Sequence, residues 1–154
     1  MLARLNNLDL TSIDLVIFDV DGTLYHQKGL RKAMLKKLMQ YYLLRPGRWQ
    51  ELKIISTFRK EREKLARQSV KDIQNYQYKV CADKLGLTAD KVKPVVDLWM
   101  FEKPLPVLPK FVFPEIRAFM QKLQKHNIKI AIWSDYEANG KLASMQLPAD
   151  LVVA

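Results

Sequence analysis

The sequence has few of the features that mark exported or membrane-embedded proteins. Its 154 residues contain a single cysteine, Cys81, which excludes an intramolecular disulfide and suits a reducing compartment. No apolar run approaches the roughly 18 residues that a membrane-spanning helix needs. The opening segment MLARLNNLDLTS interrupts its leucines with Asn and Asp before a signal-peptide core could form. We therefore expect a cytoplasmic protein with no membrane partner.

The composition also excludes general disorder, because 49% of the residues are hydrophobic and no repeat or low-complexity segment occurs. Lys and Arg outnumber Asp and Glu by 26 to 16, which gives a net charge of +10. This excess is local: residues 26–112 hold 20 Lys and Arg against 8 Asp and Glu, whereas the two ends together hold 6 against 8. A near-neutral part split by a basic middle indicates an inserted unit.

The pattern of apolar residues predicts an α/β fold with a helical insertion. Residues 14–19 and 128–133 are short apolar runs of the kind found in central parallel strands, and LVVA at the end begins a third. The middle has helical spacing up to about residue 99, and four prolines in residues 103–114 make that segment a linker. Helices are predicted from Pro114 to a last turn that contains Lys125 and His126, with Asn127 as the stop, and at about 137–146, which completes a β-α-β alternation.

Two carboxylates lie where the first predicted strand ends. Asp19 and Asp21 are followed by Gly22 and Thr23, and ligands of α/β sheets bind beyond the carboxyl ends of the strands. A bare D-x-D is a weak signal that also occurs in metal-dependent glycosyltransferases. The complete string, an apolar strand followed by DVDGTL, is far more specific.

This string resembles motif I of the haloacid dehalogenase-like (HAD) superfamily. IAIWSD, residues 130–135, is similar to motif II of that family, in which an apolar strand ends in Ser or Thr. A helical insert between the two motifs resembles the cap of the phosphoglycolate phosphatase and phosphoglucomutase-like branch. The resemblance implies an incomplete Rossmann-like core formed by residues 1–25 and 112–154, and an all-helical cap at residues 26–111.

By this resemblance the chain would be a Mg²⁺-dependent hydrolase of a small anionic phosphate monoester. Asp19 would be the nucleophile that forms an aspartyl-phosphate, and Asp21 the general acid and then base. Mg²⁺ would bind the Asp19 carboxylate and the Asp21 backbone carbonyl. Thr23, Ser134 and Asp135 would lie against the phosphate, although a carboxylate at position 135 is favourable there only beside a metal or another cation.

The family also uses a lysine and further acidic metal ligands, for which the sequence offers poor candidates. Lys129 lies at the start of its strand, some 17 Å from Ser134 at about 3.3 Å per residue. Lys141 lies roughly 10 Å along the following helix and is expected to be a poor substitute. Asp150 precedes the LVVA strand, which places it at the amino end of the sheet. We therefore expect an incomplete capped phosphatase.

Three hypotheses follow. In the first, the chain is the amino-terminal part of a capped HAD phosphatase. In the second, it is a weak or inactive scaffold whose first strand is an exposed sheet edge that binds a second copy or another chain. In the third, its basic insert binds nucleic acid. The third needs aromatic residues interleaved with cations on one face. The insert contains Trp49, Phe58, Tyr76 and Tyr78, but most of them fall at helix-core spacing, so a nucleic-acid partner is the least favoured.

Overall fold

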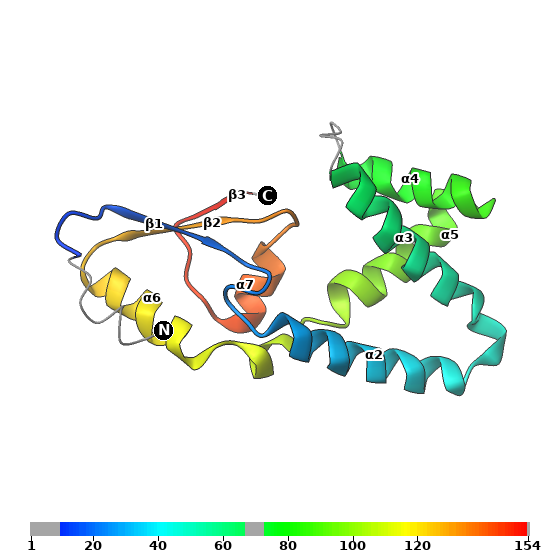
Figure 1. Ribbon diagram of the computed structural model, residues 1–154, viewed down its shortest axis with the longest axis horizontal. Coiled ribbons are helices and arrows are strands. Elements are labelled where there is room, and N and C mark those ends of the chain that lie inside the picture. Colours follow the sequence, from blue (N-terminus) through cyan, green and yellow to red (C-terminus); the bar gives the residue numbers. More distant parts are fainter. Residues whose placement is uncertain (1–9, 67–72, 154) are drawn as a thin grey trace. The chain divides into compact units, whose positions relative to one another are not determined.

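The computed structural model describes residues 10–66 and 73–153. Its strands and main helices, in chain order, are β1 (Leu15–Asp19), α2 (Gln27–Leu43), α3 (Gln50–Ala66), α4 (Ile73–Leu85), α5 (Ala89–Val96), α6 (Pro114–Lys125), β2 (Lys129–Trp133), α7 (Asn139–Met145) and β3 (Leu151–Val153) (Figure 1). Short 3₁₀ helices span Pro46–Arg48 and Leu108–Phe111, and a π-helical segment spans Asp97–Glu102. The predicted α/β class is confirmed by three parallel strands joined by helices.

The chain divides into two compact units, which are described separately. The sheet unit comprises Met1–Ala33 and Leu105–Ala154, and the helical unit comprises Met34–Pro104. The division thus falls seven or eight residues inside the expected insert, within α2 and within the proline-rich segment. The first turns of α2 belong to the sheet unit because they pack on its returning chain: a Cβ on Gly29 would lie 2.8 Å from the Phe111 ring.

The two ends of the insert pair with each other at the sheet unit. Tyr25 and Val112 form an antiparallel bridge. On either side of it, the His26 N–H donates to the Phe111 carbonyl at 2.8 Å, and the Phe113 N–H donates to the Leu24 carbonyl at 3.2 Å. The outgoing and returning chains are therefore hydrogen-bonded to each other directly after the DVDGTL segment.

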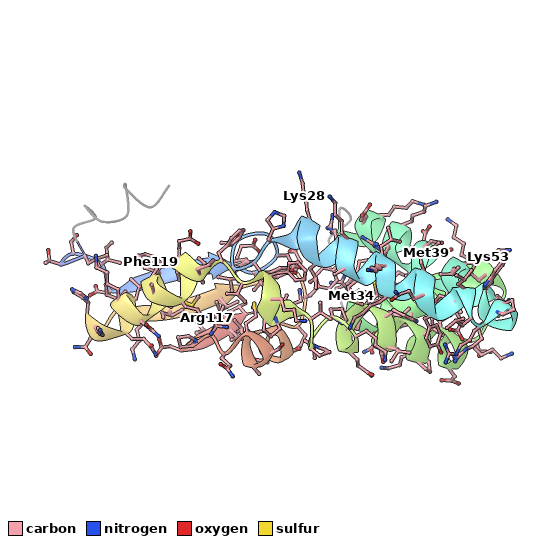
Figure 2. The ribbon with its side chains drawn as sticks, turned by 90° about the horizontal axis from the view of Figure 1, so that it is seen from below. Lys28, Met34, Met39, Lys53, Arg117 and Phe119 are labelled. Carbon is pink, nitrogen blue, oxygen red and sulfur yellow. The ribbon has the colours of Figure 1, made fainter. Side chains whose placement is uncertain are left out.

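The three strands form a parallel sheet of order β1-β2-β3, with Phe18 opposite Ile132 and Asp19 opposite Trp133. Both crossovers advance in the same direction, so right-handed connections place α6 and α7 on the same face. Figure 1 shows both helices below the strands. The core lies between these layers: Ile130 and Ile132 are fully buried, and the Phe18 ring meets Phe119 of α6, labelled in Figure 2, edge to face at 6.0 Å.

The opposite face of the sheet is apolar and exposed. Alternate residues of the strands point there, and the exposed fractions of the large apolar ones run from 46% at Val153 to 63% at Trp133. The large apolar residues on this face are Leu15, Ile17, Trp133, Leu151 and Val153, and the register adds Asp19, Lys129 and the buried Ala131. Parallel sheets in proteins are normally covered on both faces. Within the described residues this sheet has one covered face and one bare face, and β1 pairs only with β2.

Local sequence signals around β2 are confirmed. Pro114 is the first residue of α6, a position whose N–H has no partner within the helix, so the N–H that proline lacks is not needed. Glu115 lies in the first turn, where a negative charge is favourable. Asn127 ends the helix with φ of 57°, the left-handed conformation that Asn tolerates better than most residues. The chain then enters β2 at Lys129, one residue after the predicted start.

The helical unit has its own apolar core. One cluster joins α3, α4 and α5, and a second surrounds the Trp99 indole; their buried residues are Ile54, Phe58, Cys81, Ala82, Val92 and Val96 in the first and Tyr42, Ile55 and Trp99 in the second. Phe58 therefore lies in the core, as its spacing predicted. The same prediction for Tyr76 is wrong, since Tyr76 is exposed, as is Trp49. Among the described residues no helix is both long and apolar enough to cross a bilayer.

Candidate active site

The residues of the two sequence motifs meet at the carboxyl edge of the sheet. Asp19 ends β1 and lies opposite Trp133, so Ser134 follows at the same level on the neighbouring strand. The Leu24 N–H donates to the Val20 carbonyl at 3.1 Å, which folds the segment after β1 into a turn. Gly22 lies in that turn with φ of 99°, where a residue with a Cβ would be strained. This turn keeps Asp19 and Asp21 together at the carboxyl end of β1.

Asp19 is exposed and has one bond to the turn. The Thr23 hydroxyl donates to its Oδ2 at 3.0 Å. Its other carboxylate oxygen has no hydrogen-bond donor among the described residues, so it is accessible from solvent. A carboxylate that is oriented through one oxygen and open at the other suits either a nucleophile or a metal ligand.

Asp21 has a different environment. Its Oδ1 accepts hydrogen bonds from the Tyr25 hydroxyl and from Lys141 Nζ, the latter at 2.6 Å. Tyr25 is buried, and burial together with the hydrogen bond to Asp21 raises the pKa of its phenol well above the ordinary value, so it stays a neutral donor. Two neighbouring carboxylates thus have separate partners, one a threonine hydroxyl and the other a cation and a phenol.

The expectation that Lys141 is a poor substitute for a site lysine is wrong in its geometry. α7 begins at Asn139, two residues later than predicted, which leaves Lys141 in its first turn, close to the carboxyl edge of the sheet. The long lysine side chain then covers the remaining distance to Asp21. The expected distance of roughly 10 Å is based only on the rise along the helix. It takes account neither of the residue at which the helix begins nor of the length of the lysine side chain.

Ser134 is buried and fixed at the start of the loop after β2. Its N–H donates to the Val153 carbonyl at 3.0 Å, and its Oγ accepts the Tyr136 N–H at 3.3 Å. Asp135 is exposed beside it. The phosphate contacts assigned to Thr23, Ser134 and Asp135 remain predictions, since they concern a ligand.

The opposite edge of the sheet contains the remaining candidates. Asp150 accepts the Ile130 N–H at 2.8 Å and lies 3.3 Å from Lys129 Nζ. The backbone hydrogen bond, with the lysine adding to it, lowers the pKa of the Asp150 carboxyl. Asp150 and Lys129 therefore lie at the amino end of the sheet, as expected, away from Asp19 and Ser134. Their contacts join the residue before β3 to β2.

The residues after β1 offer two oxygen ligands for a hard cation. One is the open carboxylate oxygen of Asp19, and the other is the backbone carbonyl of Asp21, which accepts no hydrogen bond within the described part of the chain. Mg²⁺ typically takes one or two carboxylates and completes its shell with water and substrate phosphate, so this donor set fits it. No group of three or more His, Cys, Asp or Glu residues in residues 10–66 and 73–153 could hold a metal on its own.

A parallel sheet with a carboxylate at the end of its first strand, a second carboxylate two residues later and a serine directly after the second strand is typical of the HAD-like hydrolase class. The family model described as haloacid dehalogenase-like hydrolase matches residues 13–150. The chain therefore belongs to the haloacid dehalogenase-like hydrolase family. None of the curated proteins matches it.

Proposed function

We propose that this protein hydrolyses phosphate monoesters with Mg²⁺ through an aspartyl-phosphate on Asp19. The observation that carries the proposal is the pair of carboxylates at the end of β1 with unlike surroundings. Asp19 has one open oxygen, whereas Asp21 is held by Lys141 and Tyr25. Two carboxylates with different environments can take the separate roles of nucleophile and proton carrier.

The reaction proceeds in two displacements. A carboxylate oxygen of Asp19 attacks phosphorus, the ester P–O bond breaks, and the leaving oxygen takes a proton from Asp21. A water oxygen then attacks the phosphorus of the aspartyl-phosphate and gives a proton to Asp21. The bond between phosphorus and Asp19 breaks, which releases inorganic phosphate and restores both carboxyl groups to their starting states.

The approach of an anionic nucleophile to an anionic phosphate is opposed by charge repulsion. Mg²⁺, when bound by Asp19 and the Asp21 carbonyl, supplies the positive charge that offsets this repulsion. The protein residues do the rest. The Thr23 hydroxyl holds Asp19 in orientation, and Ser134 lies at the neighbouring strand end, where a phosphoryl oxygen can accept its hydroxyl proton.

The direct test is phosphate release from an aryl phosphate. We expect turnover with Mg²⁺ that is lost on chelation, and a fall of at least about 10³-fold in Asp19→Asn because the nucleophile is gone. Asp14→Asn, a change of the same kind at the other end of β1, is the matched control and should keep wild-type activity. Wild-type protein with no Mg²⁺-dependent turnover would refute the proposal.

A second candidate function is that of a binding scaffold. In the part of the chain that the structure describes, β1 has a free edge and the sheet face around Ile17 and Trp133 is bare, and both features favour this function. We propose a second copy of this chain as the occupant. A two-fold axis perpendicular to the sheet, beside the middle of β1, would pair the two edges antiparallel and continue the sheet across the dimer, with Ile17 close to its own copy.

Light scattering after size-exclusion chromatography tests this second candidate. We expect dimers that dissociate in Ile17→Lys, which places like charges of the two copies near each other across the paired strands, and persist in Glu115→Lys, which changes charge at the exposed start of α6. Hydrogen exchange should show protection of β1 amides in the dimer. A wild-type monomer at high protein concentration would contradict it.

A further inference from the structure

We propose that Lys141 is a positioning residue for Asp21: together with Tyr25 it fixes one carboxylate oxygen so that the other is presented to the leaving group. This inference rests on the proposed phosphatase function and adds a role for a residue outside the two sequence motifs. Lys141 comes from α7, 120 residues away from Asp21 in the sequence.

The two donors converge on the same atom. Lys141 Nζ and the Tyr25 hydroxyl both donate to Oδ1 of Asp21, and Oδ2 receives no donor from the described residues. A carboxylate bound twice through one oxygen cannot rotate about its Cβ–Cγ bond without breaking both bonds. Oδ2 is then the atom that can carry and transfer a proton.

The environment of this pair makes it stronger than a surface ion pair. The side chains of Lys141 and Asp21 are 19% and 26% exposed, whereas those of Lys129 and Asp150 are 70% and 44% exposed. Charge-assisted hydrogen bonds strengthen as water is removed, and exposed pairs contribute little. Lys141 Nζ also lies 5.6 Å from the centre of the Tyr136 ring, which restricts the lysine further.

A positioning role for the proton donor has a chemical signature. An alkoxide leaving group needs a proton as the ester bond breaks, whereas 4-nitrophenolate leaves without one. Loss of Asp21 orientation should therefore slow alkyl phosphates far more than 4-nitrophenyl phosphate. A lysine that instead bound the phosphoryl group would affect both substrates equally and would also contribute to binding of inorganic phosphate.

The experiment compares kcat/KM for an alkyl phosphate and 4-nitrophenyl phosphate in wild type, Lys141→Met, Lys141→Arg and Tyr25→Phe. kcat/KM depends on the steps up to and including phosphoryl transfer to Asp19, so the rate of hydrolysis of the aspartyl-phosphate does not affect it. In Lys141→Met we expect a loss of about 10²-fold for the alkyl phosphate and no more than about threefold for the aryl one. Inhibition by inorganic phosphate should be unchanged.

The companion variants separate position from charge and from folding. Lys141→Arg keeps a cationic donor and should restore most of the alkyl phosphate activity, and Tyr25→Phe removes the second donor and should show the same selective loss. Lys129→Met removes a lysine at the opposite edge of the sheet and should change neither substrate. Equal losses on both substrates, or no loss on either, would overturn the proposal.

Crystal structures of wild type and Lys141→Met provide a readout that does not depend on activity. The Asp21 carboxylate should keep its bond to Tyr25 in wild type and adopt a different orientation in the variant. An unchanged Asp21 in Lys141→Met would overturn the positioning role even if the enzyme is active. Absence of turnover in wild type would instead refute the phosphatase function, while the orientation of Asp21 would still decide the role of Lys141.

Discussion

Within residues 10–66 and 73–153 the sheet is buried on one face and bare on the other, which predicts unequal costs for equal truncations. Ile132 of β2 is fully buried under α6 and α7, and Ile17 of β1 points to the other face with 57% exposure. Replacement of either by Ala removes the same three carbon atoms. The difference in the free energy of unfolding therefore reports the burial of each face.

The magnitudes follow from burial. Three buried carbon groups at about 0.8 kcal/mol each give about 2.4 kcal/mol for Ile132→Ala, and the enclosed cavity raises this to about 3–4 kcal/mol. Ile17 loses less than half of its surface on folding and leaves no enclosed cavity, so Ile17→Ala should cost about 1 kcal/mol.

Urea unfolding followed by circular dichroism measures both variants. The experiment is done at low protein concentration, where association through β1 cannot stabilise the wild type. The midpoint of Ile132→Ala should lie well below that of Ile17→Ala, with similar slopes. Equal losses in the two variants would mean that both faces are covered in solution, and the one-sided sheet would be refuted.

Three further predictions concern the turn, the thiol and an ion pair. Gly22→Ala should lower the free energy of unfolding by about 1–2 kcal/mol because φ of 99° strains a residue with a side chain. Gly47→Ala is the control: it is also free of close contacts and should cost less than about 0.5 kcal/mol. Equal urea midpoints for the two variants would contradict the strain at Gly22. Burial raises the pKa of the Cys81 thiol to about 11, so iodoacetamide should modify the protein slowly at about pH 8 and rapidly in urea; fast modification of folded protein would contradict this burial. Hydrogen bonds from Lys84 and Lys64 lower the pKa of Glu61 in the folded state. On acidification the unfolded state therefore takes up this proton first, near its own pKa of about 4.3. The stability that the ion pairs provide above this pH should be lost as the pH falls through the lower pKa of the folded state. Glu61→Gln should therefore lose less stability than wild type between about pH 5 and pH 3, and parallel losses would show that this pair adds nothing.

Most elements of the sheet unit could be predicted because their sequence signals are local. The apolar run before Asp19 and the one before Ser134 became β1 and β2. Pro114 and Asn127 marked the two ends of α6 through their backbone preferences. The parallel order then placed both motifs at one edge, which is a consequence of strand direction alone.

The partners of Asp21 could not be predicted in the same way. Tyr25 follows the motif within a tight turn, and Lys141 reaches the site because α7 begins later than its sequence suggested. Such contacts depend on where a helix starts within two residues and on the length of a side chain. The bare face was also missed, since a continuous apolar run such as LVIF gives no sign of which side is covered.

The central claim is that Asp19 is phosphorylated during turnover. Mass spectrometry of protein quenched in acid during reaction with an aryl phosphate and Mg²⁺ tests it most directly. The claim predicts one phosphoryl group on the peptide that contains Asp19, absent from Asp19→Asn and from protein treated with a chelator. Turnover with no phosphoryl group on Asp19 at any quench time, or with the group on another residue, would contradict it.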